Sequence, residues 1–264
     1  MKYYVVDAFT NTIFKGNPAG ICFPEKELDT ETMQNIAAEN NLSETAFVTK
    51  RTGYYNLRWF TPKTEIDLCG HATLASAFII MNFIDTDASE IRFETKSGTL
   101  ITYKEKDLIV LDFPARKIKQ IPVAAEMERA IGKSVLAAYL TNASRDLILL
   151  LENEGQVKDA DPDFELIKTL ADHAVNITSK GDTVDFVSRF FAPNMGIAED
   201  PVTGSAHTGL IPFWSERLNR KTMTAMQLSK RGGTLFCENC GDRVRIAGKA
   251  ALYLQGEIFV NKNF

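Results

Sequence analysis

The chain has 264 residues, of which 45% are hydrophobic and 24% charged. These values are typical of a globular protein with a sizeable core, and the length suits about two domains. The formal net charge is −4 and no basic run is present, which argues against nucleic acid and anionic membrane surfaces as partners. The N-terminus is too polar for a signal peptide and the longest apolar run, "ATLASAFIIM", is too short to cross a membrane, so we expect a cytoplasmic protein.

Short strands and one helix are predicted for the first sixty residues. "KYYVVDAF" from Lys2 and the apolar residues of "KGNPAGICF" are rich in residues that favour strands, with Gly and Pro turn signals between them. "LDTETMQNIAAENN" predicts a helix with Asp29 or Thr30 as its N-cap and apolar residues at helical spacing. "TAFVTK" and "YYNLRWF" then predict two strands joined by a Gly turn.

A helix that is apolar on every side is predicted from Gly70. In "GHATLASAFIIMNF" hydrophobic residues cover nearly the whole circumference, which indicates a buried helix. Strands follow in "EIRFETK", "GTLITYKEK" and "DLIVLDF". The simplest arrangement wraps the strands around that helix. A similar helix begins near Ser205, although Pro212 should kink it or remove one hydrogen bond.

The second half of the chain repeats features of the first. "RWFTPKTEI" from Arg58 matches "RFFAPNMGI" from Arg189 with an offset of 189 − 58 = 131 residues, whereas Gly70 and Gly204 are 204 − 70 = 134 apart. The second copy therefore has three extra residues between the Pro and the Gly. We predict a duplicated chain with an N-terminal half at residues 1–115, a Pro-containing linker at 116–128 and a C-terminal half at 129–264.

The two helix openings at Gly70 and Gly204 are candidate anion sites. The first N–H groups of a helix have no partner within the helix, and the helix dipole places partial positive charge there. Gly allows close approach of a ligand, and His71 and Ser205 stand at or near the N-cap with side chains able to form hydrogen bonds. If the halves are related by a pseudo-twofold axis, the openings can face each other across a cleft and hold a small carboxylate.

Two other kinds of site are weaker. Asp200, Ser205 and His207 are close in sequence, but Ser and His two apart at a helix start do not face each other, and the G-x-S-x-G pattern of a hydrolase is missing. "FCENCGD" contains a C-x-x-C pair but no second ligand pair for zinc, so Cys237 and Cys240 are interpreted as flanking a hairpin turn.

Four motifs together resemble the PhzF family of phenazine-biosynthesis-protein-like isomerases: "DAFTNTIFKGNPAGIC", "NNLSETAFV", "FTPKTEIDLCGHATLASA" and "EDPVTGSAHTG". The wider resemblance is to the diaminopimelate epimerase fold. It implies an α+β protein of two pseudo-symmetric domains, each a mixed β-sheet wrapped around a central buried helix. It also implies proton transfer in the interdomain cleft with no metal or organic cofactor, and family members are often homodimers.

The resemblance assigns roles to six residues. Glu44 of "LSETAF" corresponds to the acid/base that shuttles the proton. His71, Asp200 and Ser205 correspond to the substrate-binding and proton-relay set, in which His71 and Asp200 are also catalytic candidates. Gly70 and Gly204 would offer backbone N–H groups to the substrate carboxylate. Glu44 has apolar neighbours, and burial can bring a carboxylate into the range useful for acid/base work.

Three functions are compatible with these features. The first is a cofactor-independent isomerase of PhzF type acting on a small carboxylate. The second is an amino-acid epimerase or racemase that uses Glu44 with Cys69 or Asp200. Diaminopimelate epimerases use two facing thiols, and the second half has no Cys opposite Cys69, which argues against that symmetric mechanism. The third is a non-catalytic binding protein. Cys69 is otherwise expected to be a small buried core residue.

Overall fold

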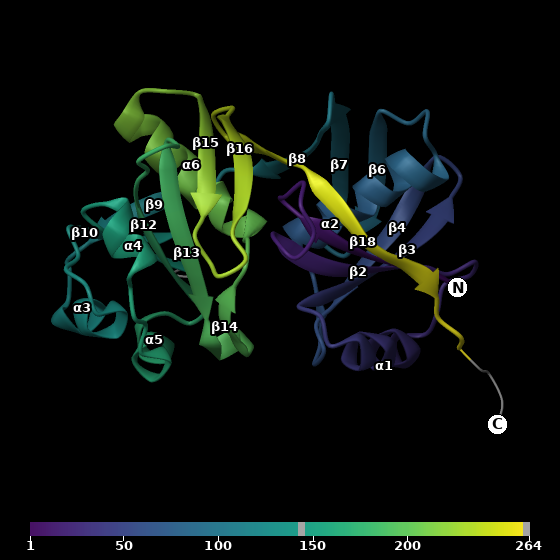
Figure 1. The fold of residues 1–264 in the computed structure, drawn as a ribbon, viewed down its shortest axis with the longest axis horizontal. Coiled ribbons are helices and arrows are strands. Elements are labelled where there is room, and N and C mark those ends of the chain that lie inside the picture. The colour runs from purple at the N-terminus through teal and green to yellow at the C-terminus, as the bar shows by residue number, and fades with distance from the viewer. Residues whose placement is uncertain (142–145, 261–264) are drawn as a thin grey trace. The chain divides into compact units, whose positions relative to one another are not determined.

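The chain folds into two compact units (Figure 1), and the computed structural model describes residues 1–141 and 146–260. Unit 1 comprises Met1–Asp112 together with the segment from Ala247 onward, and unit 2 comprises Phe113–Ile246. The chain passes into unit 2 within β8 (Leu108–Pro114) and returns to unit 1 within β17 (Arg243–Gly248).

These bounds differ from the predicted halves at 1–115 and 129–264. Residues 116–128 are not a bare linker, because they contain β9 (Ile118–Ile121) and the start of α3 (Ala125–Ile131). The last strand, β18 (Ala250–Glu257), pairs with β1 (Lys2–Ala8) and so belongs to unit 1. Prolines at positions 114 and 122 only flank the short strand β9. Strand pairing across the whole chain length, which local composition does not encode, sets the division.

Unit 1 is a mixed sheet whose strands pair in the order β18–β1–β2–β3–β4–β6–β7–β8, with β5 added at the end of β4. The pairs β2–β3 and β4–β6 are parallel and the others are antiparallel. The remaining bounds are β2 Asn17–Phe23, β3 Glu44–Arg51, β4 Tyr54–Phe60, β5 Glu65–Ile66, β6 Glu90–Thr95 and β7 Gly98–Glu105.

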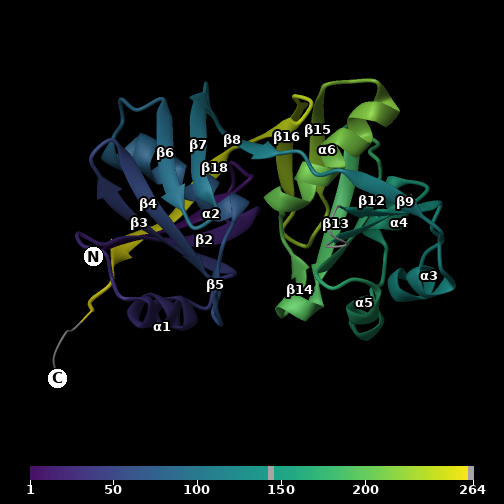
Figure 2. The same ribbon diagram turned by 180° about the vertical axis from the view of Figure 1, so that it is seen from behind.

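Helix α2 (Gly70–Ile79) is the centre of unit 1, as the apolar sequence predicts. Every one of its residues except Phe78 is buried, and it packs against β1, β2, β3 and β18 (Figure 1). A π-helical segment, Ile80–Ile84, continues it. Helix α1 (Thr30–Asn40) packs on β3 and β4 with only three buried residues, and both Figure 1 and Figure 2 show it outside the strands.

Unit 2 has the strand order β9–β10–β11–β12–β13–β15–β16, with β14 added at the end of β13. Its central helix α6 (Gly204–Leu218) continues past Pro212 and buries most of its residues. The other bounds are β10 Ala137–Thr141, β11 Asp146–Leu150, α4 Glu154–Lys158, α5 Phe164–Leu170, β12 Ala174–Lys180, β13 Phe186–Ala192, β14 Ile197–Asp200, β15 Thr222–Gln227 and β16 Gly233–Asn239.

The two units repeat one topology. Strands β1 to β5, helix α2 and strands β6 and β7 correspond in order and pairing direction to β10 to β14, helix α6 and strands β15 and β16. Each unit has two crossovers that join parallel strands. The first, β2 to β3 or β11 to β12, precedes the central helix, and the second, β4 to β6 or β13 to β15, contains it. The repeat predicted from the sequence is therefore present in the folded chain.

One ion pair is duplicated with the topology. Arg58 Nε lies 2.7 Å from Glu65 Oε1 in unit 1, and Arg189 Nε lies 2.7 Å from Glu199 Oε1 in unit 2. The two Arg residues are 131 apart and the two Glu residues are 199 − 65 = 134 apart. The three extra residues lie in the turn between them, which forms a 3₁₀ helix at Pro193–Met195. The sequence match of Ile66 with Ile197 is thus accidental.

The N-cap of α1 gives a direct test of local structure. Asp29 Oδ1 accepts a hydrogen bond of 2.8 Å from Thr32 N, so the predicted cap is confirmed. We expect Asp29→Ala to lower the free energy of unfolding by about 1 kcal/mol in urea titrations, the usual cost of removing a cap. Asp29→Asn keeps an acceptor oxygen, so its free energy of unfolding should fall much less. Equal losses for the two variants would show that the cap does not stabilise the helix.

Candidate active site

The sheet face covered by α2 carries the chemical groups of unit 1. Glu44 is the first residue of β3 and pairs with Ala19 of the parallel strand β2. Asn17 stands two residues before Ala19, so Asn17 and Ala19 share one face because side chains alternate along a strand. Helix α2 packs on both strands and brings its second residue, His71, to this face.

His71 is the centre of a buried polar cluster. Its Nε2 lies 3.1 Å from Glu44 Oε2, and its Nδ1 lies 3.2 Å from Asn17 Nδ2 and 3.6 Å from Cys69 Sγ. The exposed fractions of Glu44, His71 and Asn17 are 7%, 5% and 0%, so these groups are almost entirely withdrawn from water and depend on one another for electrostatic stabilisation. The imidazole therefore links a carboxylate on one edge to an amide and a thiol on the other.

Charge in the cluster is set by opposing effects. Burial alone would lower the pKa of His71, but hydrogen bonding to Cys69 and Glu44, together with the negative charge of the Glu44 carboxylate, raises it well above its ordinary value. Burial is also the main cause that raises the pKa of the Cys69 thiol. Because the thiol thus stays protonated near neutral pH, Glu44 is the group that supplies negative charge to a protonated His71.

Glu44, Cys69 and His71 offer ligand atoms that all lie within 4.8 Å of one another, a spacing that can suit a metal ion. However, Sγ approaches Nδ1 whereas the carboxylate approaches Nε2, and the lone pairs of the two ring nitrogens point away from each other. A single ion bound to one ring nitrogen would leave one of the other two ligands on the wrong edge. The arrangement suits transfer of a proton better than coordination.

The corresponding opening of unit 2 is built on Asp200, the last residue of β14, and Thr203, the N-cap of α6. The Thr203 hydroxyl donates a very short hydrogen bond to the Asp200 carboxylate. Gln227 Nε2 donates to Asp200 O at 2.7 Å, and its Oε1 accepts from Thr203 N at 2.8 Å. Ser205 is half-buried at the second position of α6. A buried amide thus fixes the turn that carries the carboxylate.

The six predicted site residues fall into two groups. Glu44, Gly70 and His71 are together in unit 1, and Asp200, Gly204 and Ser205 are together in unit 2. The N-caps are Cys69 and Thr203 rather than His71 and Ser205, and neither makes a side-chain capping bond, which leaves the helix openings to other acceptors. Their roles in binding and catalysis stay predictions.

Asn17 and Gln227 are site residues that the sequence analysis missed. Asn17 stands within the quoted motif "KGNPAG", where its neighbours Gly and Pro were taken as turn signals. Gln227 lies at the end of a strand and has no local signal. Only the pairing of distant strands shows that each amide contacts a helix opening.

The hydrolase interpretation is excluded by the contacts of His207. Its Nδ1 donates to Thr203 O at 2.8 Å, and burial lowers its pKa to about 4, so the ring is neutral and committed to the backbone. The C-x-x-C pair holds no disulfide: Cys237 is buried in β16 and Cys240 is exposed at the following turn, as expected for a hairpin.

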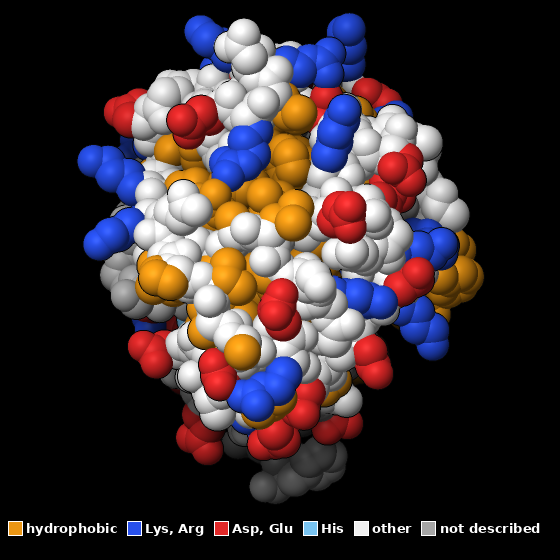
Figure 3. Space-filling model, turned by 90° about the vertical axis from the view of Figure 1, so that its left-hand side faces the viewer, with side chains coloured by type: hydrophobic (Ala, Val, Ile, Leu, Met, Phe, Trp, Pro, Cys, Tyr) orange, Lys and Arg blue, Asp and Glu red, His pale blue; other side chains and the backbone are white. Residues whose placement is uncertain are grey.

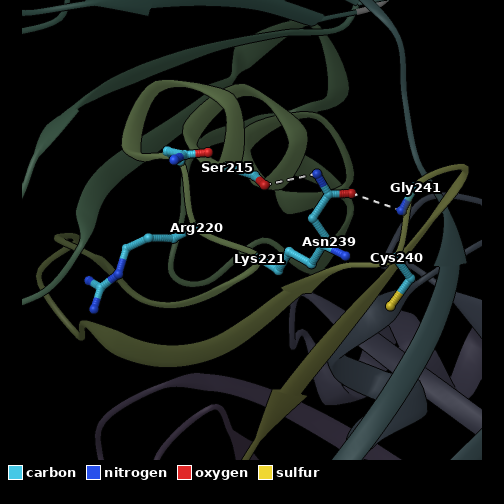
Figure 4. A pocket seen from close by; sticks show the side chains of 7 residues that line it. Ser215, Arg220, Lys221, Asn239, Cys240 and Gly241 are labelled. Carbon is cyan, nitrogen blue, oxygen red and sulfur yellow. Dashed lines mark hydrogen bonds between the residues drawn. The ribbon is translucent and has the colours of Figure 1, made fainter.

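A separate cavity of about 580 Å³ lies at the C-terminal end of α6 (Figure 4). Among its lining side chains, Asn239 Nδ2 donates to Ser215 Oγ at 2.9 Å, and Arg220 pairs with Asp185 outside the lining. It contains none of the predicted site residues. Over the described ranges 1–141 and 146–260, no helix has both the length and the hydropathy needed to span a membrane.

Comparisons with known proteins agree over nearly the full length. A family model described as "Phenazine biosynthesis-like protein" matches residues 6–256. An uncharacterized isomerase from Pseudomonas aeruginosa is 44% identical over 258 residues, which cover 98% of each chain. An uncharacterized isomerase from Halalkalibacterium halodurans is 44% identical over 260 residues, covering 97% of this chain and 98% of the relative.

Solved structures show the same relationship. The crystal structure of a PhzF-family phenazine biosynthesis protein from Enterococcus faecalis has a TM-score of 0.95 at 48% identity, covering 98% of this chain and 99% of that one. A probable proline racemase from Agrobacterium radiobacter matches with a TM-score of 0.64 at 8% identity, which shows a shared fold alone. The predicted diaminopimelate epimerase-like architecture is thereby confirmed.

Proposed function

Because the chain belongs to the PhzF-like family of isomerases, we propose that it moves a proton between carbon atoms of a small carboxylate, without a cofactor. The observation that best supports this reaction is the buried contact of 3.1 Å between Glu44 and His71. A carboxylate that is shielded from water and lies next to a group of opposite charge is suited to accept a proton from carbon and return it.

In the proposed reaction Glu44 removes a proton from a carbon activated by an adjacent unsaturated or carbonyl group. The electron pair of the broken C–H bond moves into the conjugated system, and the proton returns from Glu44 to a different carbon, so atoms and electrons balance. His71 compensates the charge of Glu44 while the carboxylate is ionised. The N–H groups at the start of α2 favour an anionic substrate.

We further propose that the residues of the unit 2 opening take part in the same reaction. Asp200, held by Thr203 and Gln227, would then be a second acid/base or binding group, and Gly70 and Gly204 would donate backbone N–H bonds to the carboxylate. Ser205 would add a side-chain hydrogen bond. This assignment is tested by asking whether variants in the two units impair one and the same reaction.

The proposed function can be tested by screening cyclic and amino carboxylates in D₂O by NMR. Deuterium should enter a carbon position of at least one compound, and the double bond of the product should shift. Binding of a carboxylate with no exchange of carbon-bound protons by the wild-type protein would instead support a non-catalytic binding protein and contradict the isomerase.

An epimerase is the second candidate, because a thiol lies 3.6 Å from His71. In that case the screen should show deuterium at a stereocentre with inversion and no shift of a double bond. A mechanism with two facing thiols is not proposed, because Thr203 occupies in unit 2 the N-cap place that Cys69 has in unit 1. Loss of exchange in Cys69→Ala with retention in Asp200→Asn would favour the epimerase.

Ser205 gives a binding test confined to unit 2. We expect Ser205→Ala to weaken binding of an active carboxylate by about 1 kcal/mol, roughly fivefold in Kd, which is the net value of one hydrogen bond. Isothermal titration calorimetry measures the change. Ser215→Ala, ten residues further along the same helix, is the matched control and should bind as the wild type does. Unchanged affinity in Ser205→Ala would remove Ser205 from the site.

We also propose that the protein works as a homodimer in the cytoplasm. Its surface leaves several large hydrophobic side chains exposed, and Figure 3 shows a face where such side chains gather among charged ones. A dimer interface would remove apolar surface of this kind from water. Light scattering after size-exclusion chromatography would give twice the mass of 29.4 kDa, whereas a monomeric mass at micromolar concentration would contradict the dimer.

A further inference from the structure

We propose that Asn17 is the positioning residue of the candidate active site, holding the His71 ring with Nε2 toward Glu44 whether or not Nδ1 carries a proton. The inference rests on the proposed function, in which Glu44 exchanges a proton with substrate. It adds a role for a buried amide that neither approaches substrate in the proposed reaction nor titrates. Its basis is the contact of 3.2 Å between Asn17 Nδ2 and His71 Nδ1.

The backbone around Asn17 is fixed from both sides. Asn17 begins β2 and pairs with Ala8 of β1. Gly16, just before it, has φ +62°, and a Cβ there would lie 2.1 Å from the carbonyl oxygen of Ala8, so only glycine fits. Asp7, which is 3% exposed, accepts the Phe14 N–H at 2.8 Å and anchors the preceding loop. The Asn17 side chain is therefore delivered to His71 by a rigid, specifically built turn.

A primary amide suits this position because it carries a donor and an acceptor on the same carbon. When His71 is neutral with its proton on Nε2, the Asn17 amide group donates to Nδ1. When His71 is an imidazolium, rotation of the amide by half a turn presents its oxygen to Nδ1–H. In both states Nε2–H stays on the ring edge that lies 3.1 Å from the Glu44 carboxylate. The ring can thus follow the charge of Glu44 without turning away from it.

The other groups that face His71 cannot replace the amide. Glu44, from β3, contacts the opposite ring nitrogen, Nε2. Cys69, from the N-cap of α2, contacts Nδ1 at 3.6 Å, but burial raises the pKa of its thiol, and a thiol is a weak hydrogen-bonding group. Without Asn17, the imidazole edge away from Glu44 would keep only this weak partner among the residues that the structure describes. Buried polar groups without good partners reorient or shift their titration.

The experiment combines histidine NMR with substrate exchange in three variants. The chain has only three histidines, so the ring signals of His173 and His207 serve as internal controls for His71. Long-range ¹H–¹⁵N spectra report which ring nitrogen carries the proton. In the wild type Nε2 should stay protonated across the titration while Nδ1 changes state.

Each variant has a distinct expectation. Asn17→Asp offers only an acceptor, so His71 should titrate about one pH unit higher or more, and exchange should slow about tenfold. Asn17→Ala offers no partner, so His71 should populate both neutral tautomers, with exchange about tenfold slower and KM within about threefold of wild type. Asn17→Ser restores a group that both donates and accepts, and it should recover part of the lost rate.

The proposal is overturned if the His71 tautomer and titration are the same in Asn17→Ala and Asn17→Asp as in the wild type. It is also overturned if all three variants, Asn17→Ser included, lose activity only in proportion to the unfolded fraction seen by circular dichroism. Failure of the proposed function is separately visible, because the wild type would then exchange no carboxylate proton while the histidine spectra still decide the role of Asn17.

Discussion

Replacing Glu44 by Gln is expected to reduce turnover about a hundredfold or more while leaving the fold and the affinity for the carboxylate nearly intact. Gln keeps the size and the hydrogen-bonding capacity of the side chain, but it cannot accept a proton from carbon. General acid/base groups typically contribute about 10²–10⁴ in rate. Steady-state turnover and deuterium incorporation, measured with a compound from the NMR screen, give the size of the loss.

The matched control is Glu39→Gln, which removes one carboxylate from an exposed position on α1. It should turn over as the wild type does, so a general effect of net charge is separated from an effect of the site. Wild-type exchange in Glu44→Gln would show Glu44 to be a structural residue. The proton would then have to be assigned to His71, Asp200 or Cys69, each of which can be substituted in turn.

Replacing His71 by Asn is expected to have the largest effect on stability. The side chains of His71 and Glu44 are 6% and 9% exposed, so the variant leaves a carboxylate buried without its partner. Removing one member of a buried ion pair typically costs about 3 kcal/mol or more. Urea titration at neutral pH should show that loss in the free energy of unfolding. Turnover and carboxylate binding should fall as well.

A double variant and a pH series separate the pair from the individual residues. Glu44→Gln combined with His71→Asn should be more stable than His71→Asn alone, since no charge is then buried. The pKa of His71 is raised in the folded state, so its contribution is fully present below the ordinary histidine pKa of about 6.5 and is lost as pH rises through the higher folded value. The difference in the free energy of unfolding between the wild type and His71→Asn should therefore become smaller as the pH rises through the folded pKa of His71. A difference that grows with rising pH would contradict the proposed ion pair between His71 and Glu44.

Local sequence signals determined helices α1, α2 and α6, the strands β1 to β4 and β6 to β8, and the repeat. An all-round apolar run from Gly70 specified a buried helix, and the N-cap at Asp29 followed from residue type and spacing alone. The collinear matches of the two halves indicated the duplicated topology, because each half must place its strands around its own apolar helix. The four quoted motifs, taken together and in order, also indicated the family.

Tertiary structure alone decided which groups meet at the site. His71 comes from a helix, whereas Glu44 and Asn17 come from two strands. Along the chain, Glu44 lies 71 − 44 = 27 residues and Asn17 lies 71 − 17 = 54 residues before His71. Only the parallel pairing of β2 with β3 beneath α2 brings the three side chains within hydrogen-bonding distance. The same holds for Gln227, which reaches Asp200 and Thr203 from β15. It also holds for the unit boundary, where β18 returns to β1. Periodicity and capping are encoded within a few residues, whereas strand register and the partners of buried polar groups depend on contacts between distant segments, which the local pattern does not specify.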